Sequence, residues 1–581
     1  MKKFLCIALA IMLVVALGVA SAEGVSGTFE GTGTGKGGAL SVKVTLENDV
    51  MTDIEVVSNG ETPGFADAMD TLKANMISGN TADVDAVAGC SLTSKGFKDA
   101  VNAALTAAGA TLVPVAVEAA AVAEKQTIEE THDIVVIGAG GAGFCAAIEA
   151  KNAGADVILI EKMPMVGGNT LISGAEYAAP ANWLQEKEGI EDNVELMVSD
   201  MLAGGDNKND PALVRVVAEG ALDGANWLRD EVGVVWEDEL MFFGGHSVKR
   251  SLIPQGASGV EIITKESQKA TALGIPVMLN TRATELITDE SGKVVGVKAE
   301  GPDANYIYHA NKAVILTTGG FGSNVEMRVK YNPDIDGSIL STNSTGSMGD
   351  GIVMAENVGA ALVDMQYIQT YPICDPLSGA LLYFDDARLY GHSVIVNLEG
   401  KRFVEELGRR DVMSMAIKAQ TGACCYEVID QNGFDESKLQ ENHAAELEYL
   451  YSKDLLVKAD TLDELAAAFG VDAAALKETV TNYNSYVDAG KDPEFNKRSM
   501  PSKIEKAPFY MIKAVPAVHH TMGGIKINDQ AQVVGTDGQV IEGLYAAGET
   551  TGGVHGTNRL GSDALADITV FGRVAGKNAS K

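Results

Sequence analysis

A glycine-rich loop at residues 138–143 is the part of the sequence with the clearest chemistry. Gly138, Gly140 and Gly143 have the G-x-G-x-x-G spacing, between an apolar run and a helical pattern, and Glu161 ends the next apolar run. Backbone N–H groups in such a loop bind a pyrophosphate at a helix N-terminus, and the carboxylate accepts hydrogen bonds from ribose hydroxyls. The pattern predicts a dinucleotide site, for which NAD and FAD are both open at this point.

The loop needs a strand before it and a helix after it, within a parallel sheet. Apolar runs at 132–137 and 156–161 supply the first two strands. Runs at 313–316 and 543–549 predict further strands of the same sheet. We therefore expect an α/β fold with a Rossmann-like domain that is split in the sequence.

Composition divides the rest of the chain. A Gly-rich unit at 23–112 has alternating strand patterns and two helical patterns, and an Ala- and Val-rich linker follows at 113–128. Helical patterns at 461–469 and 473–489 indicate an inserted α+β cap, which would exclude water from a reactive site. The predicted boundaries are 129–360 for the first part of the nucleotide domain, 361–499 for the cap and 500–581 for the second part.

The N-terminus has the pattern of a secretory signal. Lys2 and Lys3 precede an apolar run at 4–19, and residues 20–22 offer a small-residue cleavage site. The pattern predicts a signal peptide at 1–22 and an exported protein that is periplasmic, extracellular or associated with the cell surface. A transmembrane anchor is the alternative interpretation.

Charge and cysteine content exclude several classes of partner. The formal net charge is −34 at pH 7, which repels nucleic acid and anionic lipid at long range, so no nucleic-acid partner is expected. The six cysteines are scattered, Cys424 and Cys425 are adjacent, and no C-x-x-C-H haem motif occurs. We expect neither a disulfide framework nor a metal site. An anionic substrate would need a local basic pocket.

Segments beyond the glycine loop resemble the succinate dehydrogenase and fumarate reductase flavoprotein family. The resemblance extends over 130–578, is sharpest at 518–524 and 553–561, and is greatest to the soluble flavocytochrome c branch, without haem. It implies a split FAD-binding domain with a capping domain. It also implies FAD contacts from Gly138, Gly140, Gly143, Glu161, Gly168, Asn169, Thr170, Gly319 and Glu549.

The Gly-rich unit resembles FMN-binding domains through residues 85–94. In those domains a hydroxyl in an S-G-A-T-like sequence carries FMN through a phosphoester bond, and Ser91 takes that position here. Ala88 and Cys90 depart from the usual residues. The resemblance implies a small α+β FMN-binding domain with covalent FMN on Ser91 as the electron entry point. The alternative is a polar turn, with Ser94 as the N-cap of the following helix.

The same resemblance gives roles to three basic side chains. Arg410 takes the proton-donor position, and His519 and Arg559 bind a substrate carboxylate. Together they imply reduction of a C=C bond, in which hydride leaves N5 of reduced FAD and Arg410 protonates the other carbon. The alternatives are an ion pair of Arg410 with Asp411 or Glu406, a core role for His519, and a structural brace for Arg559.

One position departs from the fumarate reductases of this branch. They carry a histidine in a Q-x-H-P segment that grips a second carboxylate, whereas this chain has Tyr371. Glu176 and Asp386 place acids where the family's substrate tail lies, and acids favour a tail that donates hydrogen bonds. This combination is similar to urocanate reductases. Asp385 replaces Asp386 if the alignment shifts by one, and ordinary solvated carboxylates are a further alternative.

The fumarate enzymes relay protons through a Glu and an Arg three residues apart, and Arg388 is displaced by one when the segment is aligned on Asp386. Taken together, the resemblance implies an exported reductase of a small unsaturated carboxylate, above all urocanate to imidazole propionate. It would serve anaerobic respiration with an external membrane or cytochrome electron donor. Reduction of a hydroxycinnamate, another acrylate or fumarate is the alternative. A non-catalytic flavin electron carrier is the alternative from another class.

Overall fold

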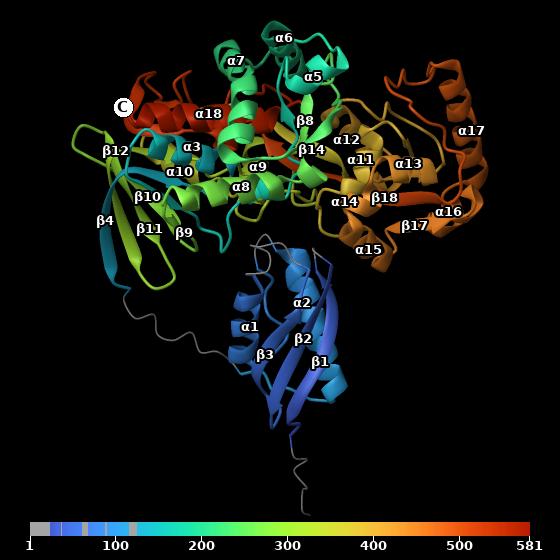
Figure 1. Ribbon diagram of the computed structural model, residues 1–581, viewed down its shortest axis with the longest axis horizontal. Coiled ribbons are helices and arrows are strands. Elements are labelled where there is room, and N and C mark those ends of the chain that lie inside the picture. The colour runs from blue at the N-terminus through green and yellow to red at the C-terminus, as the bar shows by residue number, and fades with distance from the viewer. Residues whose placement is uncertain (1–23, 36–37, 61–67, 88–89, 116–124) are drawn as a thin grey trace, which may run out of the picture.

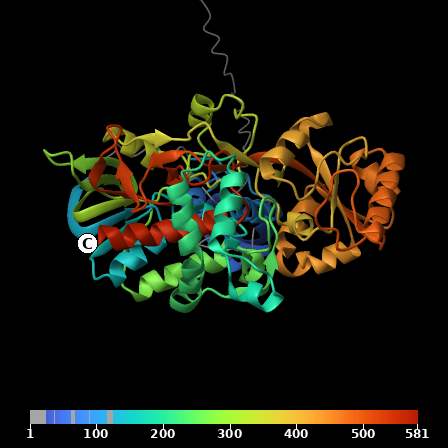
Figure 2. The same ribbon diagram turned by 90° about the horizontal axis from the view of Figure 1, so that it is seen from above.

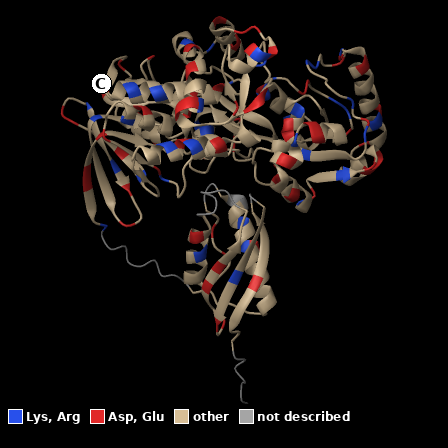
Figure 3. Ribbon diagram, viewed as in Figure 1, with Lys and Arg blue, Asp and Glu red and all other residues tan. Residues whose placement is uncertain are grey.

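The computed structural model describes residues 24–35, 38–60, 68–87, 90–115 and 125–581. The predicted signal peptide at 1–22 lies outside the described residues. The chain forms an N-terminal unit, a nucleotide-binding unit and a cap beside it (Figure 1 and Figure 2). Acidic and basic residues are spread over all three units (Figure 3). Among the helices of the described residues, none is long and apolar enough to cross a membrane.

The N-terminal unit is a three-stranded antiparallel sheet covered by two helices. Alternate residues of its middle strand, from Leu40 to Leu46, are buried, as expected for a strand with one face on a core. At Gly33 a Cβ atom would lie 2.1 Å from the carbonyl oxygen of Gly96, so glycine lets a helix pack closely here. The elements are β1 (Gly27–Gly35), β2 (Gly38–Glu47), β3 (Val50–Ser58), α1 (Ala68–Gly79) and α2 (Ser91–Ala108).

The start of α2 contradicts the alternative in which Ser94 is an N-cap. The helix begins at Ser91, and Cys90 is its N-cap. The Ser94 N–H donates to the Cys90 carbonyl oxygen at 2.7 Å, and the Ser94 Oγ accepts from the Val87 N–H at 3.0 Å. Ser94 therefore lies inside the helix, and its hydroxyl fixes the preceding chain instead of capping.

The nucleotide-binding unit is built on an eight-stranded sheet in the order β10, β11, β12, β4, β5, β9, with β21 beside β12 and β20 beside β21. The four apolar runs form parallel strands: β4 (Thr127–Ile137), β5 (Val157–Ile160), β12 (Asn305–Leu316) and β21 (Val540–Ala546). Ile137 pairs with Ile160 and Leu316, and Leu316 pairs with Ala546, so the carboxyl ends meet at one edge. The predicted split α/β fold is confirmed.

Helices and short strands surround this sheet. α18 packs against α3 and α7, and the three helices lie together at the top of the view in Figure 1. The remaining strands of the sheet itself are β9 (Val277–Met278), β10 (Arg282–Thr288), β11 (Val294–Glu300) and β20 (Gln532–Val534). The short strands around it form two small sheets, one of β6 (Tyr177–Ala178), β7 (Trp236–Met241) and β8 (Ser251–Pro254) and one of β13 (Leu362–Val363), β19 (Gly524–Lys526) and β22 (Thr551–Gly552). The helices are α3 (Gly141–Asn152), α4 (Gly168–Leu171), α5 (Trp183–Glu188), α6 (Val194–Gly204), α7 (Pro211–Trp227), α8 (Gly259–Ala272), α9 (Val325–Tyr331), α10 (Asp350–Asn357) and α18 (Asp563–Ala579).

The cap is a five-stranded sheet with helices packed on it. Its strand β18 begins after residue 499, where the cap was predicted to end, and pairs with β14, β16 and β17. At the far end of β18 the Thr521 N–H donates to Glu549 at 3.0 Å, so this strand also joins the two units. The strands are β14 (Ile368–Cys374), β15 (Val394–Val396), β16 (Cys425–Asp430), β17 (Leu456–Ala459) and β18 (Phe509–Thr521). The helices are α11 (Asp386–Leu389), α12 (Arg410–Lys418), α13 (Gln431–Glu436), α14 (Leu439–Asn442), α15 (Ala444–Ser452), α16 (Leu462–Phe469) and α17 (Ala473–Ala489).

Candidate active site

A cavity of about 850 Å³ opens at the carboxyl ends of the parallel strands. The first N–H groups of α3 have no acceptor within the helix, as a phosphate site requires. Gly143 does not line this cavity but packs beneath the loop, where a Cβ atom would lie 1.9 Å from the Gly138 carbonyl oxygen. These features fit the pyrophosphate of a dinucleotide. The predicted FAD residues that line the cavity are Gly138, Gly140, Glu161, Gly168, Asn169, Thr170, Gly319 and Glu549.

Glu161 holds the glycine loop in place. Its Oε2 accepts from the Ala139 N–H at 2.8 Å, and its Oε1 accepts from the Met163 N–H at 2.8 Å. Burial raises the pKa of this carboxyl, although both backbone bonds oppose the shift. Each oxygen keeps a lone pair for a second donor. The predicted bond from a ribose hydroxyl is therefore compatible with the geometry.

A second cavity, of about 930 Å³, adjoins the first. Asn169, Thr170 and Glu549 line both cavities. The Asn169 Nδ2 donates to Glu549 Oε2 at 3.1 Å, so the shared wall is itself a hydrogen-bonded structure. A flavin ring at this wall would face the second cavity. The six predicted catalytic and substrate residues meet in it: Glu176, Tyr371, Asp386, Arg410, His519 and Arg559.

Arg410 is the first residue of α12 and is not in an ion pair with either predicted partner. Asp411 accepts from Arg409 at 3.1 and 2.8 Å, and Glu406 accepts from Arg402 at 2.6 and 2.7 Å. The Arg410 Nη1 has no hydrogen-bond partner among the described residues, and burial lowers the pKa of the guanidinium. The ion-pair alternative is therefore wrong, and the free donor is available to a ligand.

Arg559 and His519 complete the basic part of the cavity. Burial and the charge of Arg410 lower the pKa of Arg559 to about 9, and its Nε has no partner within the described part of the chain. His519 Nδ1 lies 2.8 Å from Thr342 Oγ1. Burial, with Arg410 and Arg559, holds the pKa of His519 well below its usual value, so the ring is neutral. With Nδ1 accepting from Thr342, Nε2–H is left as a donor for a carboxylate.

Tyr371 presents its ring to the cavity, while its hydroxyl is occupied. The hydroxyl donates to Asp385, which also accepts from Arg388 at 2.6 Å through both Nε and Nη2. The Arg410 guanidinium lies 4.8 Å from the centre of the Tyr371 ring. Arg388 follows Asp385 by three residues and pairs with it, so the spacing of the relay is present when Asp385 is the acid, and the predicted displacement by one applies only to Asp386.

Asp386 is among the residues that line the second cavity, and Asp385 is not. The Asp386 Oδ2 lies 3.1 Å from His443 Nε2. The His443 ring stacks on Tyr383, with 4.7 Å between ring centres. Burial lowers the pKa of His443, but the hydrogen bond and charge of Asp386, together with the charges of Glu446 and Glu176, raise it by more. His443 and Tyr383 were not predicted, because neither belongs to a motif and their contact depends on the cap's tertiary fold.

Glu176 is the second acid of the cavity, and burial with the nearby Asp386 raises its pKa to about 7. Between about pH 4.5 and 7 the folded protein retains a proton that the unfolded chain releases, so the free energy of unfolding falls as pH rises. Glu176→Gln should therefore raise Tm at pH 8, by roughly 2–5 °C, and leave it unchanged at pH 4. Thermal melts at both pH values test this, and an equal difference at the two would contradict it.

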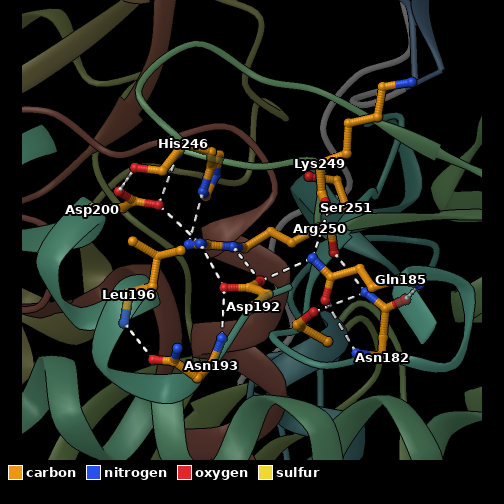
Figure 4. Close-up of polar contacts among 12 residues, drawn as sticks. Asn182, Gln185, Asp192, Asn193, Leu196, Asp200, His246, Lys249, Arg250 and Ser251 are labelled. Carbon is orange, nitrogen blue, oxygen red and sulfur yellow. Dashed lines mark hydrogen bonds and ion pairs between the residues drawn. The ribbon is translucent and has the colours of Figure 1, made fainter. Parts of the chain in front are cut away.

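A buried polar network is centred on Arg250 (Figure 4). The fully buried Arg250 pairs with Asp192 at 3.0 Å and with Asp200 at 2.9 Å, and donates to His246 Nδ1 at 3.3 Å. The opposite nitrogen of His246 donates to the Gly561 carbonyl oxygen at 2.8 Å. The network therefore fixes the backbone just after Arg559. The sequence offers no motif for it.

Known proteins share this arrangement. Residues 133–565 match the family described as FAD binding domain, and residues 35–106 match the one described as FMN-binding domain. The chain is 46% identical to the urocanate reductase of Eggerthella lenta, over 97% of this chain and 93% of that protein. The chain belongs to the fumarate reductase flavoprotein family. This flavoprotein is also 42% identical to a cytochrome-type fumarate reductase of Shewanella frigidimarina, over 78% of this chain and 77% of that protein.

A solved structure supports the same assignment for this flavoprotein. The open conformation of a flavocytochrome c3 fumarate reductase superposes with a TM-score of 0.65 at 40% identity, covering 78% of each chain. The chain is thus an FAD-dependent oxidoreductase that reduces C=C bonds, with FAD and FMN as its cofactors. The residues that line the first cavity fit FAD, because they include eight of the predicted FAD contacts.

Proposed function

We propose that this flavoprotein reduces urocanate to imidazole propionate. The composition of the second cavity carries the proposal: it combines basic side chains for one carboxylate with two acids, Glu176 and Asp386, for a tail that donates hydrogen bonds. Urocanate has one carboxylate and an imidazole ring. Tyr371 offers no cation for a second carboxylate. The 46% identical relative named urocanate reductase supports the same substrate.

In the proposed mechanism a hydride adds to the β-carbon of urocanate and a proton adds to the α-carbon. When bound and reduced by two electrons from the external donor, FAD would supply the hydride. Arg559 and His519 hold the carboxylate and stabilise the negative charge that develops on it as the C=C bond is reduced. Arg410 donates the proton to the α-carbon, and the lowered pKa of its buried guanidinium makes it a stronger acid.

Arg410 must regain a proton after each turnover. Its guanidinium lies over the ring of Tyr371, and the Tyr371 hydroxyl is hydrogen-bonded to the Asp385–Arg388 pair. Asp385 is a carboxyl within a buried set of polar groups, so it can pass a proton onward. We assign the return of the proton to this pair.

The proposal places electron entry at FMN on Ser91. Ser91 is the first residue of α2, and a helix N-terminus favours the FMN phosphate. The Cys90 Sγ lies 2.9 Å from Met165 Sδ, in the segment between Glu161 and Gly168, which both line the FAD cavity. The start of α2 therefore adjoins that cavity. We also propose that the signal pattern at the N-terminus directs export, and that an external electron donor reduces the FMN.

Steady-state assays with reduced viologen test the substrate. We expect urocanate to be reduced at least about tenfold faster than fumarate, because a second carboxylate meets Tyr371 and the acids. A preference for fumarate would overturn the proposal, and a preference for a hydroxycinnamate would show that the substrate is another acrylate.

Tyr371→His should raise the rate with fumarate relative to the rate with urocanate, because histidine can be protonated and then bind the second carboxylate of fumarate. The same steady-state assay measures this ratio.

A further inference from the structure

Two arginines share the substrate cavity, and their charges oppose each other. Arg410 comes from the cap, whereas Arg559 comes from the nucleotide-binding unit. Like charges in a site with little water repel strongly. The packing of the cap on the nucleotide-binding unit therefore places two cations in one cavity, and contacts near them must offset the repulsion.

Asp206 makes such contacts beside both arginines. Arg409, the N-cap of α12, donates from Nη1 to Asp206 Oδ1 at 2.8 Å and from Nη2 to Asp206 Oδ2 at 3.3 Å. The Thr557 hydroxyl donates to the same carboxylate. Arg409 directly precedes Arg410, and Thr557 precedes Arg559 in the same loop. One carboxylate therefore joins the start of α12 to the loop that carries Arg559.

The turn that carries Asp206 is fixed to the nucleotide-binding unit. Asp206 follows α6 with a φ of 55°, in the left-handed region that aspartate adopts more readily than most residues. The Asn558 Nδ2 donates to the Gly204 carbonyl oxygen at 3.2 Å, and the Thr557 N–H donates to the Gly205 carbonyl oxygen at 3.2 Å. The carboxylate is thus held rigidly on the side of Arg559, and its contact with Arg409 joins it to the cap.

We infer that Asp206 is a positioning residue, which latches the cap so that Arg410 and Arg559 face the same substrate. It acts through Arg409 and Thr557 and lines neither of the two cavities. The inference rests on the proposed reduction of an unsaturated carboxylate in the second cavity. An exposed ion pair contributes little to overall stability. A displacement of about 1 Å at a catalytic group, by contrast, lowers rates strongly.

Asp206→Asn keeps the size of the side chain and removes its charge. We expect kcat to fall about tenfold, with FAD content and Tm unchanged, and amide hydrogen exchange at residues 410–414 to become faster. Arg409→Gln should lower kcat at least as much, because it also removes the bonds of Arg409 to Asp411. The double variant should be no worse than Arg409→Gln alone, because that change already breaks the contact with Asp206. The control Arg498→Gln breaks the exposed Arg498–Glu405 pair, at 2.9 Å within the cap, and should keep the wild-type kcat.

Wild-type kcat and exchange rates in Asp206→Asn would overturn the latch, as would additive losses in the double variant. The latch and the proposed substrate can each be wrong without the other. If the enzyme prefers an acrylate other than urocanate, the same variants are assayed with that acrylate. The hydrogen-exchange measurement needs no substrate at all, so faster exchange in Asp206→Asn and Arg409→Gln, but not in Arg498→Gln, supports the latch whatever the substrate is.

Discussion

Arg410→Ala is expected to lower kcat for urocanate by about 10³-fold, while FAD content and Tm stay at wild-type values. The Arg410 Nη1 has no hydrogen-bond partner among the residues that the structure describes, burial lowers the pKa of the guanidinium, and the side chain lines the second cavity. Its neighbours Asp411 and Glu406 are already paired with other arginines. Removing it should therefore take away the proton donor without breaking a structural ion pair. Viologen-linked turnover, with FAD absorbance as the measure of cofactor content, tests this.

Arg498→Ala is the matched control for this change. Arg498 is a partly exposed arginine of the cap that pairs with Glu405 and lines neither cavity. It should keep wild-type turnover. If Arg410→Ala retained more than about a tenth of wild-type kcat, Arg410 would not be the general acid, since such donors contribute about 10²–10⁴-fold. The same result would favour the electron-carrier alternative.

Gly143→Ala should yield a protein that is purified without FAD and is inactive. The new Cβ atom would lie 1.9 Å from the Gly138 carbonyl oxygen and 2.9 Å from Thr317 Oγ1. The first of these is a backbone atom, so the loop must move to accept the methyl group. A displaced loop no longer aims the N–H groups of α3 at a pyrophosphate. The ratio of flavin to protein absorbance measures the loss.

Gly337→Ala provides the comparison for a methyl group added where there is room. Its Cβ atom would meet only Val325, at 3.5 Å, which is an ordinary contact distance. This variant should retain its FAD. Full FAD occupancy in Gly143→Ala would show that the loop tolerates the displacement, and the explanation of the G-x-G-x-x-G spacing would then fail.

The fold was predictable where strands are buried on both faces. The runs that became β4, β5, β12 and β21 are continuous and apolar, and turns or glycines follow them, so a parallel sheet could be inferred. β18 was assigned to the wrong side of a boundary, because its thirteen residues pair with strands that lie far away in the sequence. Such pairing leaves no local pattern.

The site was predictable where a motif fixes a residue. The family segments supplied Arg410, His519 and Arg559, and all three line one cavity. The positions of Asp385 and Asp386 could not be told apart from the sequence, because consecutive residues of a helical turn point in different directions. In the structure Asp385 pairs with Arg388, and Asp386 lines the second cavity. His443 bonds Asp386 across the cap, a contact that depends on tertiary packing and not on spacing.

A single-turnover experiment tests the central claim most directly. Enzyme reduced without oxygen is mixed with urocanate or with fumarate, and the return of oxidised FAD absorbance is followed by stopped flow. We expect rapid reoxidation by urocanate with formation of imidazole propionate, and reoxidation by fumarate at least about tenfold slower. Equal or faster reoxidation by fumarate, or none by urocanate, would contradict it.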